Sequence, residues 1–193
     1  SFFIERWFCC SSLICRILQG IKADRRGCRF HNYQDASVMR IISGTLKGRN
    51  ILVPKNFKGR PTTDFGREGL FNVLNNLVDF NEIHVLELFA GTGAFSIECF
   101  SRGAEYMKSV EKDPLHARFI RDNFRSFEMA HAEVVLADVM KFLGQESQQY
   151  DLIFADPPFD LPSLELLPGL VLGRNLLKSE GVFVLEHGKR NNF

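Results

Sequence analysis

The apolar positions follow a regular alternation of two patterns after residue 80. Apolar runs predict five strands, at residues 83–89, 106–111, 132–137, 151–155 and 181–186. Helical spacing between them predicts helices at residues 94–101, 114–127, 139 onward and 164–177. Strands that alternate with helices form parallel βαβ units, with helices on both faces of the sheet. The expected fold class is therefore α/β and Rossmann-like.

The region before residue 80 predicts a smaller unit. Residues 40–44 and 49–54 resemble two short strands of a β-hairpin, and a helix follows over residues 65–78. Residues 1–38 have no clean hydrophobic period, and the first methionine is Met39. We therefore expect three parts, which are a non-native or disordered extension (1–38), a hairpin-and-helix unit (39–80) and the main domain (81–193). A genuine N-terminal helix is the alternative for residues 1–38.

Charge divides unevenly between these parts, although the 193-residue chain has a net charge of only +1. Residues 39–68 carry a net +5 and residues 81–193 a net −6. A basic surface beside a more acidic body suits a polyanionic partner, and an ordinary solvated surface is the alternative. The candidate RNA-contacting side chains are Arg40, Lys47, Arg49, Lys55, Lys58, Arg60 and Arg67.

Two classes of protein are disfavoured by composition. No apolar run is long enough to predict a membrane span. Four of the five cysteines lie in the first 28 residues with no zinc-ligand spacing, so we expect a reduced, cytoplasmic protein without a metal site.

Ligands of such sheets bind beyond the carboxyl ends of the strands, and those ends carry the chemistry here. The first strand ends in Glu87-Leu-Phe89-Ala90-Gly91-Thr92-Gly93, where two glycines permit a tight turn and a close backbone approach. Nicotinamide enzymes share this Gly-x-Gly pattern. However, Ser96 stands where their fingerprint has glycine or alanine, which leans away from a dinucleotide.

Acidic residues end the next two strands. Glu111 lies 20 residues after Gly91, and a carboxylate there can accept hydrogen bonds from both hydroxyls of a ribose. Asp138 can accept from an adenine amino group, and Val139 can pack on its ring. An ordinary helix cap is the alternative for Asp138.

The fourth strand ends in Asp156-Pro157-Pro158-Phe159, which is the most specific motif in the chain. The prolines fix the backbone and remove two N–H donors, so carbonyl acceptors and the Asp156 carboxylate remain. An exocyclic amine needs such acceptors, and an extruded base needs a ring such as Phe159 to stack on. A proline-terminated strand with a core phenylalanine is the alternative.

These motifs, together with Arg40-Ile-Ile-Ser-Gly44 and Arg60-Pro-Thr-Thr-Asp64, resemble the RsmD family of class I methyltransferases over residues 39–193. That family makes N2-methylguanine in 16S rRNA of the small ribosomal subunit. Two departures stand out: Phe65-Gly66 replaces a pair that is commonly Arg-Val, and the family's last two strands are missing after Phe193. We therefore expect Val182–Leu185 to be an exposed sheet edge.

The resemblance implies S-adenosylmethionine as cofactor, 16S rRNA or the assembling subunit as partner, a monomer when full length, and no metal. It implies cofactor contacts from Glu87, Phe89, Ala90, Gly91, Thr92, Gly93, Glu111, Lys112, Asp138 and Val139. Asp156, Pro157, Pro158 and Phe159 would hold the guanine. The open alternatives are a methyltransferase for another base or a protein amide, a nicotinamide oxidoreductase, and a non-catalytic RNA-binding remnant.

Overall fold

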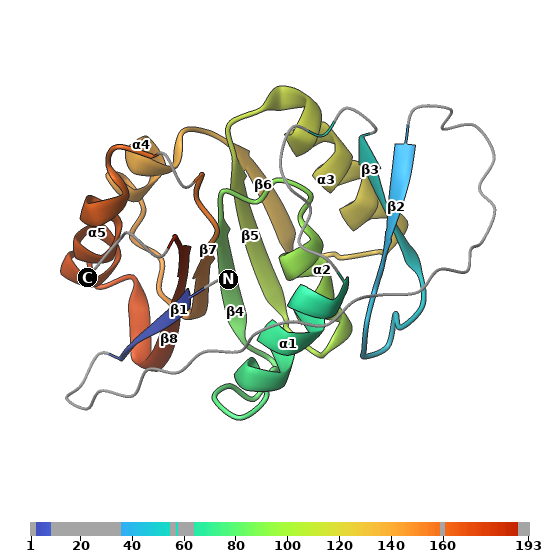
Figure 1. Ribbon diagram of the computed structural model, residues 1–193, viewed down its shortest axis with the longest axis horizontal. Helices are drawn as coiled ribbons and strands as arrows, with labels where there is room; N and C mark the ends of the chain where they lie inside the picture. Colours follow the sequence, from blue (N-terminus) through green and yellow to red (C-terminus); the bar gives the residue numbers. More distant parts are fainter. Residues whose placement is uncertain (1–2, 9–35, 55–56, 58–63, 159–160, 189–193) are drawn as a thin grey trace.

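A computed structural model describes residues 3–8, 36–54, 57, 64–158 and 161–188. One six-stranded sheet runs through it in the order β1-β8-β7-β4-β5-β6 (Figure 1). The strands are β1 (Phe3–Phe8), β4 (His84–Leu88), β5 (Tyr106–Glu111), β6 (Ala132–Leu136), β7 (Tyr150–Ala155) and β8 (Leu177–His187). All pairs from β8 to β6 are parallel, so the five-stranded parallel sheet is confirmed.

Helices cover both faces of this sheet, as the alternation of strands and helices predicts. One core cluster joins the sheet to α1 (Asp64–Leu74), α2 (Ala94–Ser101) and α3 (Pro114–Ser126). The other joins it to α4 (Val139–Leu143), the 3-10 turn η1 (Leu164–Leu166) and α5 (Leu167–Gly173). Within β7, Leu152 and Phe154 belong to the first cluster, and Ile153 and Ala155 to the second. Alternate residues of a strand thus face opposite layers.

The hairpin consists of β2 (Ala36–Arg40) and β3 (Asn50–Pro54), which form a separate two-stranded sheet (Figure 1). The first strand was expected at 40–44 but ends at Arg40. Residues 41–49 instead form a loop closed by hydrogen bonds between Ile41 and Arg49 and between Gly48 and Ile41. Gly44 and Gly48 have φ values of 80° and 82°, which are incompatible with strand backbone.

Two polar side chains hold the hairpin against the main domain. The Asn123 amide of α3 accepts from the Leu52 N–H at 2.9 Å and donates to its carbonyl at 2.7 Å, as a neighbouring strand would. The buried Glu98 carboxylate of α2 accepts from the backbone N–H groups of Ile42 and Ser43 at 2.8 and 2.9 Å. Ile41, Ile51 and Val53 are buried in the same core cluster as α2 and α3. The hairpin therefore packs as part of the main domain.

The structure differs from three expectations, two of which concern the ends of the chain. β8 was expected to be an exposed edge, but β1 pairs with it antiparallel from Phe3↔His187 to Phe8↔Val182. Two parts of residues 1–38 are therefore strands, β1 and the start of β2. Backbone pairing needs no side-chain period, which is why the pattern of residues 1–38 did not reveal it. The helix expected over residues 164–177 is divided into η1 and α5.

Within the part of the chain that the structure describes, no helix is both long enough and apolar enough to cross a bilayer.

Candidate active site

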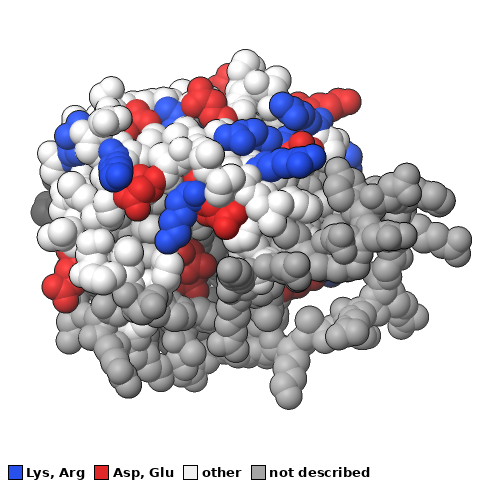
Figure 2. Space-filling view, turned by 90° about the horizontal axis from the view of Figure 1, so that it is seen from above, with Lys and Arg blue, Asp and Glu red and all other residues white. Residues whose placement is uncertain are grey.

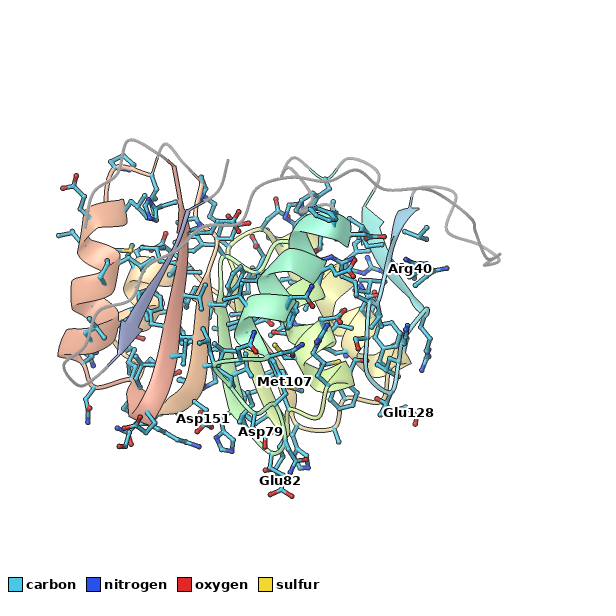
Figure 3. All side chains as sticks on the ribbon, turned by 60° about the horizontal axis from the view of Figure 1, so that its bottom comes forward. Arg40, Asp79, Glu82, Met107, Glu128 and Asp151 are labelled. Carbon is cyan, nitrogen blue, oxygen red and sulfur yellow. The ribbon has the colours of Figure 1, made fainter. Side chains whose placement is uncertain are left out.

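The carboxyl ends of β4, β5, β7 and β8 meet at one edge of the sheet. The opposite edge, where the strands begin, carries Asp79, Glu82 and Asp151, which lie together at the bottom of Figure 3 and away from Arg40 on the hairpin. Asp151 is bound there, because its Oδ2 accepts from the His84 N–H and from Lys178 Nζ. Some of the acidic side chains thus lie at the edge of the sheet that faces away from the predicted site.

The loop after β4 has the backbone that a close ligand contact needs. Phe89, Gly91 and Gly93 have φ values of 58°, 54° and 70°, so the chain turns sharply before α2 begins. A Cβ on Gly93 would lie 2.8 Å from Ile120 Cγ2, so only glycine fits there without a shift. A Cβ on Gly91 would lie 3.1 Å from Phe57 Cζ. Phe57, which the sequence did not single out, therefore lies against this loop.

Glu111 connects the Gly91 loop to the end of β5. Its Oε2 accepts from the Gly91 N–H at 2.8 Å, and its Oε1 accepts from the Asp113 N–H at 2.7 Å. Each carboxylate oxygen can accept a second hydrogen bond. The side chain is therefore fixed at the strand end while it keeps acceptor capacity toward a ligand.

Glu87 does not lie where a cofactor contact was expected. Its side chain is buried under α2, and its Oε2 accepts from the Ser96 N–H at 3.2 Å and from Ser109 Oγ at 3.1 Å. Burial raises the pKa of this carboxyl to about 7, and the hydrogen bonds from Ser96 and Ser109 oppose that shift. The physical reason is strand alternation, because the side chain of Glu87 points into a face of the sheet and not beyond its edge. Glu87 joins β4, β5 and α2 internally.

The remaining predicted cofactor residues fall into two groups. Lys112 and Asp138 are exposed, whereas Ala90, Thr92 and Val139 are buried. Asp138 is the N-cap of α4, since its Oδ1 accepts from the Lys141 N–H at 3.1 Å. Asp138 therefore acts as a helix cap, which was the alternative interpretation. A hydrogen bond from an adenine amino group to Asp138 stays a prediction.

Asp156 directly follows β7. It lies beside the Gly91 loop, because that loop follows β4 and β4 is paired with β7. Its carboxylate is half-buried and burial raises its pKa. Pro157 is buried and Pro158 is exposed, while Phe159 lies outside the described residues. Burial and the nearby charge of Asp156 raise the pKa of Glu186 in β8, a residue that sequence reasoning missed because no motif surrounds it.

The predicted basic surface is only partly as expected. Arg40 and Lys47 are exposed, and Arg49 lies over the Phe127 ring at 4.7 Å and donates to the Ser126 carbonyl. Arg67 was predicted to contact RNA, but its side chain is buried. It is only 3% exposed, and its Nη2 donates to the Arg40 carbonyl and to Asp64 Oδ1, both at 2.7 Å. Arg67 is therefore a structural residue between α1 and the hairpin, and Lys55, Lys58 and Arg60 lie outside the described residues.

Further basic side chains come from α3, although the predicted RNA-contacting residues all lie before it in the chain. Arg118 and Arg125 are exposed on this helix, where they form ion pairs with Asp122 at 3.8 and 3.5 Å, and the hairpin packs on the same helix through Asn123. Figure 2, viewed from above, shows Lys and Arg side chains across this face, with a closer group toward the hairpin side and acidic side chains among them. The exposed basic side chains thus come from two parts of the chain that are distant in sequence.

Comparison with known proteins settles the family. The family model described as "Conserved hypothetical protein 95" matches residues 39–193. The chain belongs to this family. It is the RsmD family that the motifs resemble, because several relatives of the chain are named Ribosomal RNA small subunit methyltransferase D.

One relative in this family is Ribosomal RNA small subunit methyltransferase D of Escherichia coli (strain K12). It is 32% identical over 160 residues, which cover 83% of this chain and 80% of the relative. The solved structure of yhhF from Escherichia coli is also 32% identical, with a TM-score of 0.73, and the match covers 81% of this chain and 85% of that one. A second solved structure, of a putative methyltransferase complexed with SAH, is 20% identical with a TM-score of 0.65, and the match covers 85% of this chain and 45% of that one. The class I methyltransferase fold is thus confirmed.

Proposed function

We propose that this protein transfers a methyl group from S-adenosylmethionine to the exocyclic N2 amine of a guanine in 16S rRNA, free or within the assembling small ribosomal subunit. The observation that carries the proposal is the meeting of two motifs at adjacent strand ends. The Gly91 loop and Glu111 end β4 and β5, and Asp156-Pro157 ends β7, which is paired directly with β4. The name of the Escherichia coli relative supports rRNA of the small subunit as the substrate.

The residues fit the cofactor by their donors and acceptors. The positive-φ loop at Gly91 and Gly93 leaves room for the amino-acid part, and Glu111 keeps acceptor capacity for ribose hydroxyls. The cofactor supplies an electrophilic methyl group on a sulfonium. A nicotinamide cofactor is disfavoured, because hydride transfer leaves Asp156-Pro157-Pro158 without a role.

Asp156 and the Pro157 carbonyl would orient the amine. With its two hydrogens bound by these acceptors, the N2 lone pair is aimed at the methyl carbon. The N–C bond would form as the S–C bond breaks and S-adenosylhomocysteine leaves, and the surplus N2 proton would pass to the Asp156 carboxylate and then to solvent. In this reaction the protein mainly positions the two reactants and excludes water.

The direct test uses the purified protein with S-adenosylmethionine labelled on the methyl group. Small ribosomal subunits and their deproteinised rRNA, both from cells that lack this enzyme, are the two substrates. We expect label in N2-methylguanosine after nuclease digestion, at one position that primer extension identifies. Label in another base, in DNA or in protein would show that the substrate is not an rRNA guanine. Saturable NAD binding without S-adenosylmethionine binding would refute methyl transfer as the reaction.

Glu111→Ala should weaken S-adenosylmethionine binding by about 10- to 100-fold, since hydrogen bonds to a charged group contribute roughly 1.5–3 kcal/mol. Calorimetry measures this affinity. The matched control is Glu105→Ala, which removes an exposed carboxylate just before the other end of β5. Equal affinities for both variants would remove Glu111 from the proposed cofactor site.

The double variant Arg40→Ala/Lys47→Ala should weaken rRNA binding for all sequences and leave cofactor affinity unchanged. Each lost phosphate contact makes the negative slope of log K against log salt shallower by roughly 0.7–0.9, so we expect the double variant to be shallower by about 1.5. Filter binding between low and high salt measures that slope. Lys141→Ala/Arg174→Ala removes the same charge from the α4 and α5 side and should leave the slope as it is. Identical slopes for both double variants would contradict an RNA-binding role of the hairpin.

A further inference from the structure

Asp156 and Glu186 lie side by side at the ends of two paired parallel strands. Ala155 of β7 is in register with Leu185 of β8. Asp156 comes directly after Ala155, and Glu186 comes directly after Leu185. Phe154 and Val184, two residues before the acids, both belong to the core cluster on the α2 side. Because side chains alternate along a strand, the Glu186 carboxylate lies on this same face of the sheet, and Asp156 directly follows the end of the neighbouring β7. The electrostatic effect of Asp156 on Glu186 agrees with that proximity.

Glu186 differs from every other buried carboxylate in the described part of the chain. Glu87, Glu98 and Glu111 each accept hydrogen bonds from backbone N–H or side-chain donors. Glu186 is only 7% exposed, and no described residue donates to it or to Asp156. Burial raises the pKa of both acids, and the Asp156 charge raises that of Glu186 further.

A largely buried carboxylate to which no described residue donates has a raised pKa, and such perturbed acids concentrate at functional sites. In their ionised form both carboxylates only accept hydrogen bonds, so a ligand that complements the ionised pair presents adjacent donors and no facing lone pair. Three nucleic-acid bases carry an exocyclic amine. In adenine and cytosine the ring nitrogen beside the amine is an acceptor, whereas in guanine N1 beside the amine carries a hydrogen.

We propose that Glu186 is a specificity-determining residue that accepts the N1–H of the guanine while Asp156 accepts from its N2 amine. This inference rests on the proposed function and adds the reason for its choice of base. An adenine or cytosine in the same position would direct a ring lone pair at the Glu186 carboxylate. Glu186 makes and breaks no bond in the transfer itself, because its contact is with N1 and the methyl group goes to N2.

The experiment compares two bases at the position that the methylation assay identifies. A synthetic segment ligated into the rRNA carries either guanine or 2,6-diaminopurine, which keeps the C2 amine but has a lone pair at N1. Wild-type enzyme should methylate the guanine form with a kcat/KM about 10- to 100-fold higher, in line with one well-placed base contact. Glu186→Gln presents an amide that can also donate to a lone pair, so this preference should fall about tenfold or more.

A conservative variant separates recognition from folding. Glu186→Asp keeps the carboxylate and should retain the preference for guanine, even where its overall rate is lower. Calorimetry with S-adenosylmethionine and thermal melting should give wild-type values for both variants. A preference that Glu186→Gln leaves unchanged would overturn the inference, as would a loss of cofactor binding in both variants. If wild-type enzyme methylates no rRNA guanine at N2, the proposed function fails with it, so the two failures are distinguishable.

Discussion

Asp156→Ala is expected to abolish most methyl transfer while S-adenosylmethionine affinity stays within about twofold of wild type. The Asp156 carboxylate lies at the end of β7 and would contact only the amine, whereas the cofactor is expected over the Gly91 loop and Glu111. Loss of a positioned acceptor and proton-accepting group typically slows a reaction by about 10²–10⁴-fold. Single-turnover assays on the rRNA measure the chemical step, and calorimetry measures cofactor affinity.

Asp156→Asn is the matched variant, because it keeps the shape and one carbonyl acceptor but takes no proton. We expect its rate between those of wild type and Asp156→Ala. An alanine variant within about threefold of wild type would mean that backbone carbonyls alone orient the amine. A parallel loss of cofactor binding would instead place Asp156 in the cofactor site.

The fold could be predicted from the sequence because hydrophobic period and strand ends are local signals. The parallel sheet, its helices and the Gly91 loop all follow from runs of fewer than 20 residues. The features that were missed depend on partners distant in the chain. Arg67 reads as a surface charge until the Arg40 carbonyl, 27 residues away, is placed against it.

Glu87 and Glu186 also show that partners distant in the chain decide what a carboxylate in a strand contacts. Both are acids within strands, yet Glu87 is held internally by Ser96 and Ser109, and Glu186 has an acidic neighbour in Asp156. The pattern of one strand gives the face on which a side chain lies but not the donors opposite it. Only strand order and register decide which carboxylate is satisfied within the fold.

Gly44→Ala is expected to destabilise the protein by about 3–5 kcal/mol, which is the largest stability effect among these variants. Gly44 has a φ of 80°, and a Cβ there would lie 1.7 Å from the Ser101 carbonyl oxygen and 2.2 Å from its carbon. These are backbone atoms at the end of α2, so they cannot rotate away. The hairpin loop must therefore separate from α2, and it loses the hydrogen bonds from Thr45 N–H to Ser101 O and from Leu46 N–H to Ser101 Oγ.

Gly48→Ala provides the control within the same loop. Gly48 has nearly the same φ, 82°, but a Cβ there would meet no atom within 4 Å. Its cost is then the left-handed backbone alone, about 1–2 kcal/mol. Urea unfolding of both variants separates backbone strain from the collision with Ser101, and equal losses would show that the loop moves away from α2 freely.

The same pair of variants links stability to the proposed RNA contact. Arg40 and Lys47 lie on either side of Gly44, and the loop between them is fixed to α2 by the Glu98 carboxylate through Ile42 and Ser43. If Gly44→Ala detaches this loop, the two basic side chains lose their fixed position relative to the strand ends. The variant should then bind rRNA more weakly than Gly48→Ala at a temperature where both are folded, while S-adenosylmethionine affinity stays equal. Equal rRNA affinities would mean that the hairpin contributes charge but no fixed geometry to the RNA-binding surface.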